Sequence, residues 1–539
     1  MPIEQLLKRS GIGSVETREP AAAFADPLTL GPPAPGEGPY LEVRSVASGL
    51  ATLYEKFRNT LDYRDEHLIR VYAIRRILKR RLVRGAQAHE VTQPLLQELI
   101  RGGYVGTNAI PERELPLYHA LITKYIQLFH WLVATGGESV SAKTWDWVFV
   151  LAANELEERL VPAPHRALAA ERLIQMVIQQ QLLRQWNLSQ EEEWNQATIA
   201  VCRSLLKLNN DMISWVLFRH EIPRWLETPD EQEVVRVAQH FLGIQKRIDA
   251  ALRSAAGDRL SRHIKPASTT LWLLLETMQE AEDRPSLLER PSLLKTALLE
   301  TISSRSKSIR RRLSRTLRRS LLYIFLTKMA LALLVEVPFD RLVQGSVNYT
   351  NLAFNIAAPL LLLLIFGLLV RVPGQENTEA IVSTAEAMVY GGSVSFDPLR
   401  PPASHRAILN RLFQASYTVI YLVTFGVIVT ILLRFGFTVL GILLFLLFLS
   451  IVSFFGFRIR EQAQDLIVIK GQERFLVFLA VLFFLPILRT GRWISQQSSK
   501  INVFLYLVDL FIEAPLQAFL EFFDKFTGFV REKKDDVTS

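Results

Sequence analysis

The sequence has almost no cysteine and none of the short patterns on which many common enzymes are built. Its single cysteine, Cys202, excludes an internal disulfide framework and a cysteine-rich zinc site. The phosphate-binding GxxxxGKS or GxxxxGKT loop and the HExxH, CxxC and GxSxG patterns are all missing. We therefore identify no catalytic residue, no cofactor and no metal site, and these absences favour a protein that is not an enzyme.

Acidic residues are missing from a short stretch in which basic residues are crowded. The stretch contains eight Lys and Arg side chains, which we call the collar: Arg305, Lys307, Arg310, Arg311, Arg312, Arg315, Arg318 and Arg319. The chain carries a net charge of +9, and outside the collar its basic and acidic residues balance to within one charge. A nucleic-acid-binding domain would be basic as a whole, so we expect no nucleic-acid partner. A basic cluster beside an apolar segment favours contact with anionic lipid headgroups instead.

Long apolar runs are missing from the first 300 residues. Residues 1–40 are rich in Pro, Gly and Ala and have no basic start followed by an apolar run, so we expect a disordered leader without a signal peptide. From about Val43 apolar residues recur at three- and four-residue steps, which predicts a series of helices. No stretch alternates strictly enough to indicate a substantial sheet. The predicted fold is therefore all-α, with a soluble helical domain over residues 41–283.

Three local patterns refine this domain. Ser189 and Glu192 form a predicted capping box, at the start of a helix expected to run from Ser189 to Phe218. Six basic residues between Arg75 and Arg84 suit either an RNA or lipid patch or a solvated helix end that complements the helix dipole. The repeated hexapeptide at residues 284–295 places a Pro near the start of each copy, which bars a continuous helix and predicts a hinge between the soluble domain and the collar.

Apolar runs dominate the last 220 residues. A membrane core about 30 Å thick takes roughly 20 helical residues, and four runs approach that length. They are Leu321–Val337, Leu352–Val370, Leu412–Leu433 and Phe435–Phe457. A fifth run, Phe475–Leu488, is short and contains Pro486, so it either spans or is re-entrant or surface-lying. Val503–Val530 has one acidic and one apolar face, which predicts an amphipathic helix.

The predicted organisation follows from these runs. It has five parts: a leader (1–40), a cytoplasmic helical domain (41–283), a hinge with the collar (284–319), a transmembrane domain (320–490), and a C-terminal amphipathic helix with a charged tail (491–539). Because cytoplasmic flanks of spans are enriched in Lys and Arg, the collar places the N-terminal domain in the cytoplasm. We therefore expect a multi-pass protein of the plasma or inner membrane.

Ionisable residues at membrane depth are the main candidates for function. Lys328 lies near the middle of the first run and Glu336 near its far end. In a regular α-helix they would be about 80° apart around the axis and about 12 Å apart along it, so no direct pair is expected. Because a charge at this depth is costly, Lys328 should face a partner. The acids Asp509 and Glu513 of the C-terminal helix are candidates, either as a structural ion pair or as part of an ion or proton pathway.

Asn355 and Pro359 share a face of the second run. A proline frees a backbone carbonyl one turn earlier, and such a kink beside an amide can bind ions. A purely structural kink is the alternative.

Two functions follow from these patterns. The large helical domain and the missing catalytic motifs favour a membrane scaffold or assembly factor that binds a protein partner or a second copy. The intramembrane polar residues favour a transporter or channel component. A third, weaker hypothesis is a lipid-modifying enzyme that uses the loop at residues 372–411, and its polar residues are Glu376, Glu379, Glu386 and His405.

Overall fold

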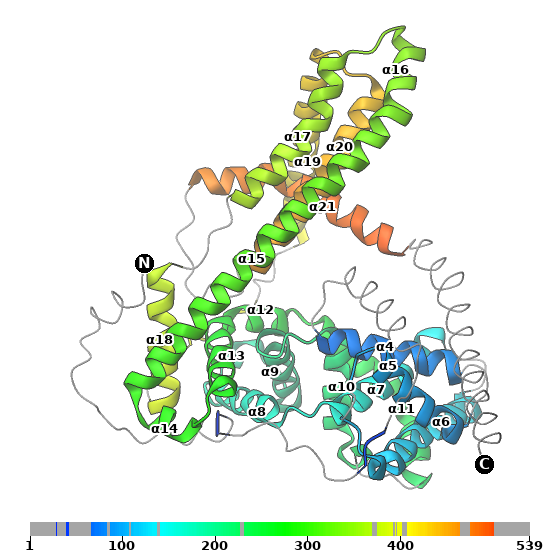
Figure 1. Cartoon of the computed structure of the whole chain (residues 1–539), viewed down its shortest axis with the longest axis vertical. Helices are drawn as coiled ribbons and strands as arrows, with labels where there is room; N and C mark the ends of the chain where they lie inside the picture. The colour runs from blue at the N-terminus through cyan, green and yellow to red at the C-terminus, as the bar shows by residue number, and fades with distance from the viewer. Residues whose placement is uncertain are drawn as a thin grey trace, which may run out of the picture. The chain divides into compact units, whose positions relative to one another are not determined.

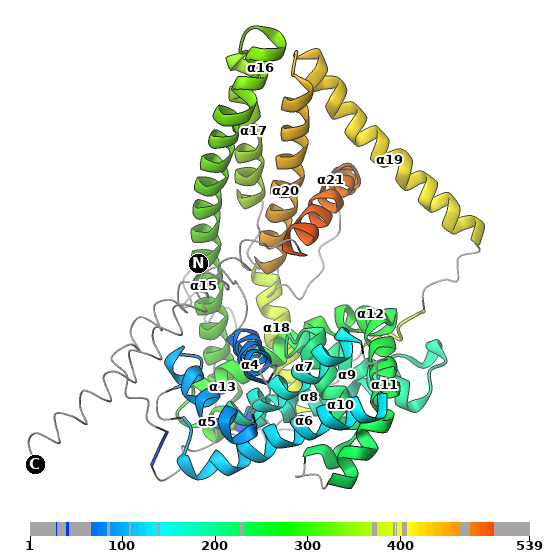
Figure 2. The ribbon, with the colours of Figure 1, turned by 90° about the vertical axis from the view of Figure 1, so that its right-hand side faces the viewer.

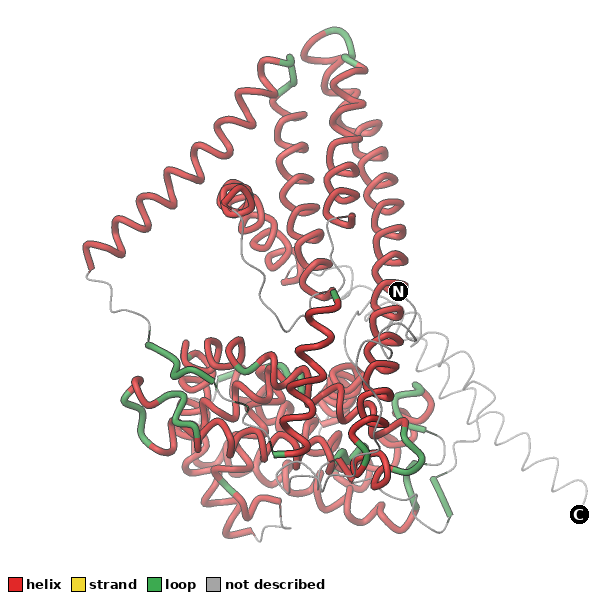
Figure 3. The backbone as a smooth tube through the Cα atoms, turned by 90° about the vertical axis from the view of Figure 1, so that its left-hand side faces the viewer, coloured by secondary structure: helices red, strands yellow, loops and turns green. Residues whose placement is uncertain are grey.

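The computed structural model describes residues 28–29, 39–41, 66–82, 87–106, 109–136, 141–226, 231–368, 374–391, 394, 396–401, 407–463 and 475–500. Every regular element in these ranges is a helix, and their only extended pairing is an isolated bridge between Tyr40 and Pro111 (Figure 3). The predicted all-helical fold is thus confirmed for the described part of the chain.

The chain forms two compact units. The helical unit holds residues 18–289 and 387–401, and the long-helix unit holds residues 290–386 and 402–508.

The helical unit is built from short and medium helices. They are α4 (Glu66–Leu82), α5 (Ala88–Arg101), η1 (Glu112–Glu114), α6 (Leu115–Gly136), α7 (Ala142–Leu160), α8 (Pro164–Gln179), η3 (Arg184–Trp186), α9 (Gln190–Ser204), α10 (Asn210–Glu221), η4 (Pro223–Leu226), α11 (Glu231–Arg253), α12 (Ala255–His263), α13 (Lys265–Glu280) and α14 (Arg284–Glu289). In Figure 1, α8, α9, α12 and α13 lie together, and α4 to α7, α10 and α11 form the other side of the unit.

The core of this unit is centred on α7. Its residues from Trp147 to Leu156 are all buried, so α7 is covered on every side by its neighbours. A helix of this kind is expected at the centre of a bundle, because a surface helix would keep one polar face. Aromatic side chains fill the space beside it, and Trp147 meets Phe218 of α10 and Phe241 of α11 at ring-centroid distances of 5.8 and 4.8 Å.

The capping box at the start of α9 is confirmed. The Ser189 hydroxyl accepts from the Glu192 amide at 3.2 Å, and the Glu192 carboxylate accepts from the Ser189 amide at 2.9 Å. The prediction of one helix from Ser189 to Phe218 is wrong, because α9 ends at Ser204 and α10 begins at Asn210. Lys207 lies between them with φ of +55°, a left-handed conformation that no α-helix contains.

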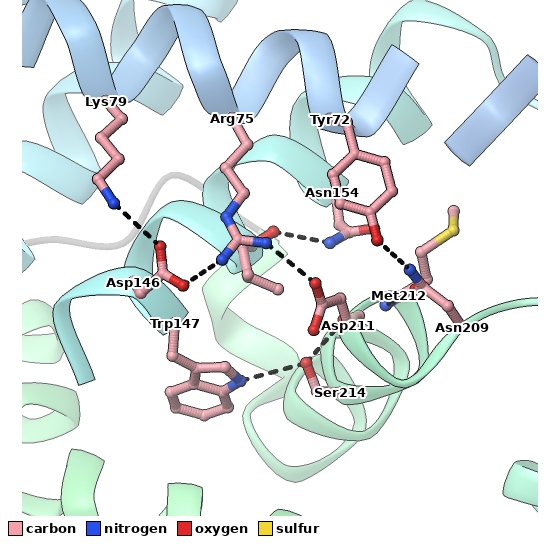
Figure 4. A network of polar contacts seen from close by, with 11 residues as sticks. Tyr72, Arg75, Lys79, Asp146, Trp147, Asn154, Asn209, Asp211, Met212 and Ser214 are labelled. Carbon is pink, nitrogen blue, oxygen red and sulfur yellow. Dashed lines mark hydrogen bonds and ion pairs between the residues drawn. The ribbon is translucent and has the colours of Figure 1, made fainter. Parts of the chain in front are cut away.

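The arginine-rich end of α4 is paired inside the helical unit. Arg75 bridges Asp146 of α7 and Asp211 of α10, and Lys79 approaches Asp146 at 3.5 Å (Figure 4). Further along, Arg80 binds Glu98 of α5. These contacts fit neither sequence interpretation, because the side chains join helices instead of forming a free basic patch or a solvated end.

A segment from the far part of the chain also belongs to the helical unit. Residues 394–400, which we call the strap, follow α18 (Gln375–Tyr390) and lie against α8, η3 and α12. The Gln180 amide donates to the Val394 carbonyl at 2.7 Å and accepts from the Phe396 amide at 3.1 Å. The Leu399 amide donates to the Leu182 carbonyl at 2.9 Å, and the Trp186 indole donates to the Leu399 carbonyl at 2.9 Å. The backbone of the strap is therefore held by specific hydrogen bonds.

The long-helix unit contains the apolar runs. Its helices are α15 (Pro291–Leu331), the π-helical turn η5 (Ala332–Glu336), α16 (Val337–Gln344), α17 (Tyr349–Leu368), most of α18, α19 (Ala407–Arg434), α20 (Val439–Ala463) and α21 (Phe475–Lys500). Figure 2 shows α15, α17 and α20 side by side, while α19 diverges from α20 beyond the turn at Gly436. As the repeated hexapeptide predicts, α14 and α15 begin with a proline in their first turn, and the extended Arg290 separates them.

Among the described residues, three helical segments are long and apolar enough to cross a membrane. They are Pro291–Val343, Gln414–Arg434 and Val439–Phe457. The remaining predicted span lies on α17, whose apolar part Tyr349–Ile365 is shorter than these three segments.

The helix that contains the fifth apolar run is longer than the run itself, because α21 continues through Pro486 to Lys500. It runs across the direction of α15 and α20 (Figure 1). The predicted amphipathic helix Val503–Val530 lies outside the described residues.

Candidate functional site

A polar cluster lies inside the long-helix unit, where α15, η5, α16, α17 and α20 meet. Its members are Lys328, Glu336, Asp340, Asn355 and Thr438, all at least nine-tenths buried. The π-helical turn shapes this site, since it includes an extra residue and changes which side chains share a face. Lys328 and Glu336 are therefore both buried in the interior of the unit.

Lys328 is the most deeply buried charged group of the cluster. Its side chain is 0% exposed, and its Nζ has no hydrogen-bond partner in the described part of the chain. The ammonium lies 4.6 Å from the centre of the Phe448 ring of α20, a cation–π contact that offsets part of the lost hydration. It also interacts electrostatically with Glu336, without a direct ion pair between the two described side chains. The absence of a direct pair agrees with the expectation from the sequence.

Glu336 is held by Asn355 and a glycine. The Asn355 amide nitrogen donates to Glu336 Oε1 and also approaches the Gly441 carbonyl at 3.4 Å. A Cβ on Gly441 would lie 3.1 Å from Glu336 Oε1 and 3.2 Å from Thr438 Oγ1. Glycine at this position therefore lets the carboxylate approach α20 closely. Glu336 Oε2 and Asn355 Oδ1 are buried and have no partner among the described residues.

A second carboxylate lies one helical turn beyond the first. Asp340 Oδ1 accepts a hydrogen bond from Thr438 Oγ1 at 2.8 Å, and the Thr438 hydroxyl also accepts from the Gly441 amide at 3.2 Å. Thr438 thus links the start of α20 to α16. Asp340 is not among the residues predicted from the sequence, although its position four residues after Glu336 on one apolar segment is a usable signal.

The structure brings together three of the five predicted intramembrane residues, namely Lys328, Glu336 and Asn355. The other two, Asp509 and Glu513, lie outside the described residues. Glu376 and Glu379 of the lipid-enzyme hypothesis are exposed on α18, and His405 lies outside the described residues.

The collar is part of one uninterrupted helix. All eight of its basic residues lie within α15, and seven of them are exposed while Arg305 is half-buried. None of the exposed seven forms an ion pair with another described residue. At 1.5 Å per residue, the collar extends about 21 Å along the helix axis from Arg305 to Arg319. The opposite face of α15 packs through Leu313 and Leu317 near Leu363 of α17.

Buried ionisable groups in the helical unit are held in closed networks. Lys124 of α6 donates to Glu155 at 2.7 Å and to the Trp225 carbonyl at 2.8 Å, and the Tyr125 hydroxyl donates to Glu155 at 2.7 Å. Burial lowers the pKa of Lys124, which the Glu155 charge opposes, and burial raises the pKa of Tyr125. Burial also raises the pKa of Cys202 to about 12, so this thiol stays protonated and unreactive at neutral pH.

Comparison with known proteins gives no relative for this chain: no protein-family model, curated protein or solved structure matches it. Function must therefore be argued from the residues themselves.

Proposed function

We propose that the chain is a multi-pass membrane protein that holds its helical unit at the cytoplasmic face as a non-enzymatic scaffold or assembly factor. The observation that carries this proposal is the strap. The chain leaves the helical unit at Glu289, continues through the long-helix unit, and returns to the helical unit at residues 387–401. The helical unit is therefore connected to apolar segments at two separated places in the sequence, an arrangement suited to presenting a fixed protein surface.

The strap also supports the four-span topology. Because residues 289 and 387 belong to one folded unit, the chain between them crosses the membrane an even number of times. The segment Pro291–Val343 and the returning α17 supply one such pair, and α19 and α20 supply the next. The collar at the start of the first crossing favours a cytoplasmic location for the helical unit. Because α21 runs across the direction of α15 and α20, we expect α21 to lie at the membrane surface instead of crossing the membrane.

Cysteine accessibility tests this topology. In a Cys202→Ser background, a cysteine introduced by Ser346→Cys should react with a membrane-impermeant reagent added outside intact cells. One introduced by Ser383→Cys on the exposed face of α18 should react only after the cells are opened. External labelling at position 383 would refute the arrangement.

The scaffold function predicts a partner that depends on the strap. The tagged full-length protein, extracted in mild detergent, should retain a protein partner or a second copy in stoichiometric amount. Leu399→Pro removes the amide that donates to Leu182 and should weaken this retention. Asp397→Asn is the matched control, because it leaves the strap backbone unchanged. A wild-type protein that purifies alone and monomeric would contradict the scaffold function.

A transporter or channel component is the second candidate, and the unpaired Nζ of the fully buried Lys328 favours it. If Lys328 contributes to a conduction path, Lys328→Met should fold normally but lose ion flux in proteoliposomes. If Lys328 is structural, the same change should destabilise the protein, because it leaves the buried Glu336 charge less compensated. Thermal stability and flux, measured on one preparation, separate the two roles.

A further inference from the structure

The polar cluster has an imbalance of charge that neither candidate function explains. Lys328, Glu336 and Asp340 are the only buried ionisable side chains among the described residues of the long-helix unit. With one ammonium and two carboxylates ionised, the cluster carries a net charge of −1. A buried charge without compensation is strongly unfavourable, so the folded cluster needs one more positive charge.

The unpartnered atoms show where that charge belongs. Glu336 Oε2 and Asn355 Oδ1 are acceptors without a donor, on side chains that are 3% and 0% exposed. They belong to residues already joined by the bond from Asn355 to Glu336 Oε1. Native structures rarely leave such atoms unsatisfied, so these two acceptor oxygens need a hydrogen-bond donor or a cation. Only a proton or a hard cation would also supply the missing positive charge.

The backbone around these oxygens is adapted to their close approach. The π-helical turn ends at Glu336, and turns of this kind occur frequently at functional sites. Gly441 leaves room for the carboxylate, because any side chain there would crowd Glu336 Oε1 and Thr438 Oγ1. The nearby Gly441 carbonyl adds a further oxygen, at 3.4 Å from the Asn355 amide nitrogen.

We propose that Glu336 and Asn355 bind a single monovalent cation, either a proton or an alkali metal ion, inside the long-helix unit. The net charge of −1 selects a monovalent ion, because a divalent ion would reverse the imbalance. Lys328 limits the bound charge to one, since its own ammonium already compensates one carboxylate. The site goes beyond the scaffold function and does not depend on whether the helical unit binds a partner.

The test uses the full-length protein in two measurements. Sodium binding is measured by equilibrium dialysis with radioactive Na⁺ at constant ionic strength, with choline as the replacing cation. Protonation is measured by infrared difference spectroscopy of the protein in liposomes, as a carboxylic-acid band that disappears when the pH is raised. Binding of one Na⁺ per chain identifies an alkali-metal site, and the titrating band without sodium binding identifies a proton site.

Variants assign the signal to this cluster. Glu336→Gln should abolish the sodium binding or the titrating band, and Thr424→Val, which changes a buried threonine outside the cluster, should preserve it. If Glu336→Gln does not fold, Gly441→Ala provides the same test, because its added methyl group should weaken sodium binding or shift the midpoint of the band. The proposal is overturned if neither signal occurs in the wild type, or if the signal persists unchanged in the folded variant.

Discussion

Replacing Lys124 by methionine should destabilise the helical unit strongly. Lys124 and Glu155 are 6% and 1% exposed, and the lysine donates two of the hydrogen bonds that close this network. Methionine preserves much of the side-chain volume but removes the charge and both bonds. Glu155 would then be ionised in the core with the Tyr125 hydroxyl at 2.7 Å as its remaining donor in this network.

The expected magnitude follows from the burial of the pair. Breaking a buried ion pair from one side costs about 3–5 kcal/mol, because the remaining charge loses its compensation. For a folded unit of 150–250 residues, each kcal/mol lowers the Tm by roughly 2–4 °C, so the Tm should fall by about 6–20 °C. The second change Glu155→Gln should recover most of this loss, since it removes the uncompensated charge.

Intrinsic tryptophan fluorescence during heating is a suitable assay. Eight of the nine tryptophans lie within residues 18–289, so the signal reports on the helical unit within the full-length protein. The matched control is Lys143→Met, which breaks the more exposed pair with Asp249 and should cost no more than about 1 kcal/mol. A Lys124→Met protein that melts with the control would refute the reasoning.

Three further predictions concern other regions. His220 stacks on Trp194, and burial lowers the pKa of the folded imidazole below its usual 6.5. Below about pH 6.5 the unfolded chain gains a proton at this histidine more readily than the folded chain, so the stability of the fold should decrease as the pH falls. In melting curves measured at acid pH, His220→Phe should reduce this decrease. Gly491→Ala should disrupt the packing of α21, because its Cβ would overlap the α20 backbone, and limited proteolysis of α21 would detect the change. In liposome flotation at low salt, Arg319→Gln should weaken binding to anionic vesicles more than Arg305→Gln. Along α15, Arg305 lies about 21 Å further from the apolar segment than Arg319, and the headgroup layer is only about 5–8 Å thick.

Periodicity predicts the helices, but it predicts their breaks and bends less well. The capping box at Ser189 is readable because both partners lie within four residues of each other. The break at Lys207 contains neither Gly nor Pro, but Asn209 two residues later is a readable signal, since its side chain caps α10 by accepting from the Met212 amide at 2.9 Å. The π-helical turn that ends at Glu336 has a partial signal in Pro338, which cannot donate a helical hydrogen bond, but a proline does not by itself specify a π-helical turn.

Charged clusters can be located in a sequence, but their partners are set by the fold. The basic residues at the end of α4 and those of the collar look alike in composition, yet Arg75 is paired with acids 71 and 136 residues away, while the collar residue Arg312 is exposed and forms no ion pair with a described residue. The distinction comes from tertiary packing, because the end of α4 lies against acidic residues of α7 and α10, whereas no acidic side chain in the described ranges pairs with the exposed basic residues of α15. The dipole of a single helix contains no information about partners on other helices.

The strap could not be predicted for a related reason. Its hydrogen bonds to the helical unit use its own backbone amides and carbonyls, so no side-chain pattern in residues 394–400 encodes these bonds. Its partners Gln180 and Trp186 lie more than 200 residues earlier and look like ordinary polar and aromatic surface residues in the sequence. Once the strap is known, however, it constrains what the hydropathy pattern leaves open. It joins residues 387–401 to the helical unit. Under the proposed membrane topology, the chain between Glu289 and residue 387 would then cross an even number of times, which favours a transmembrane role for the relatively short α17.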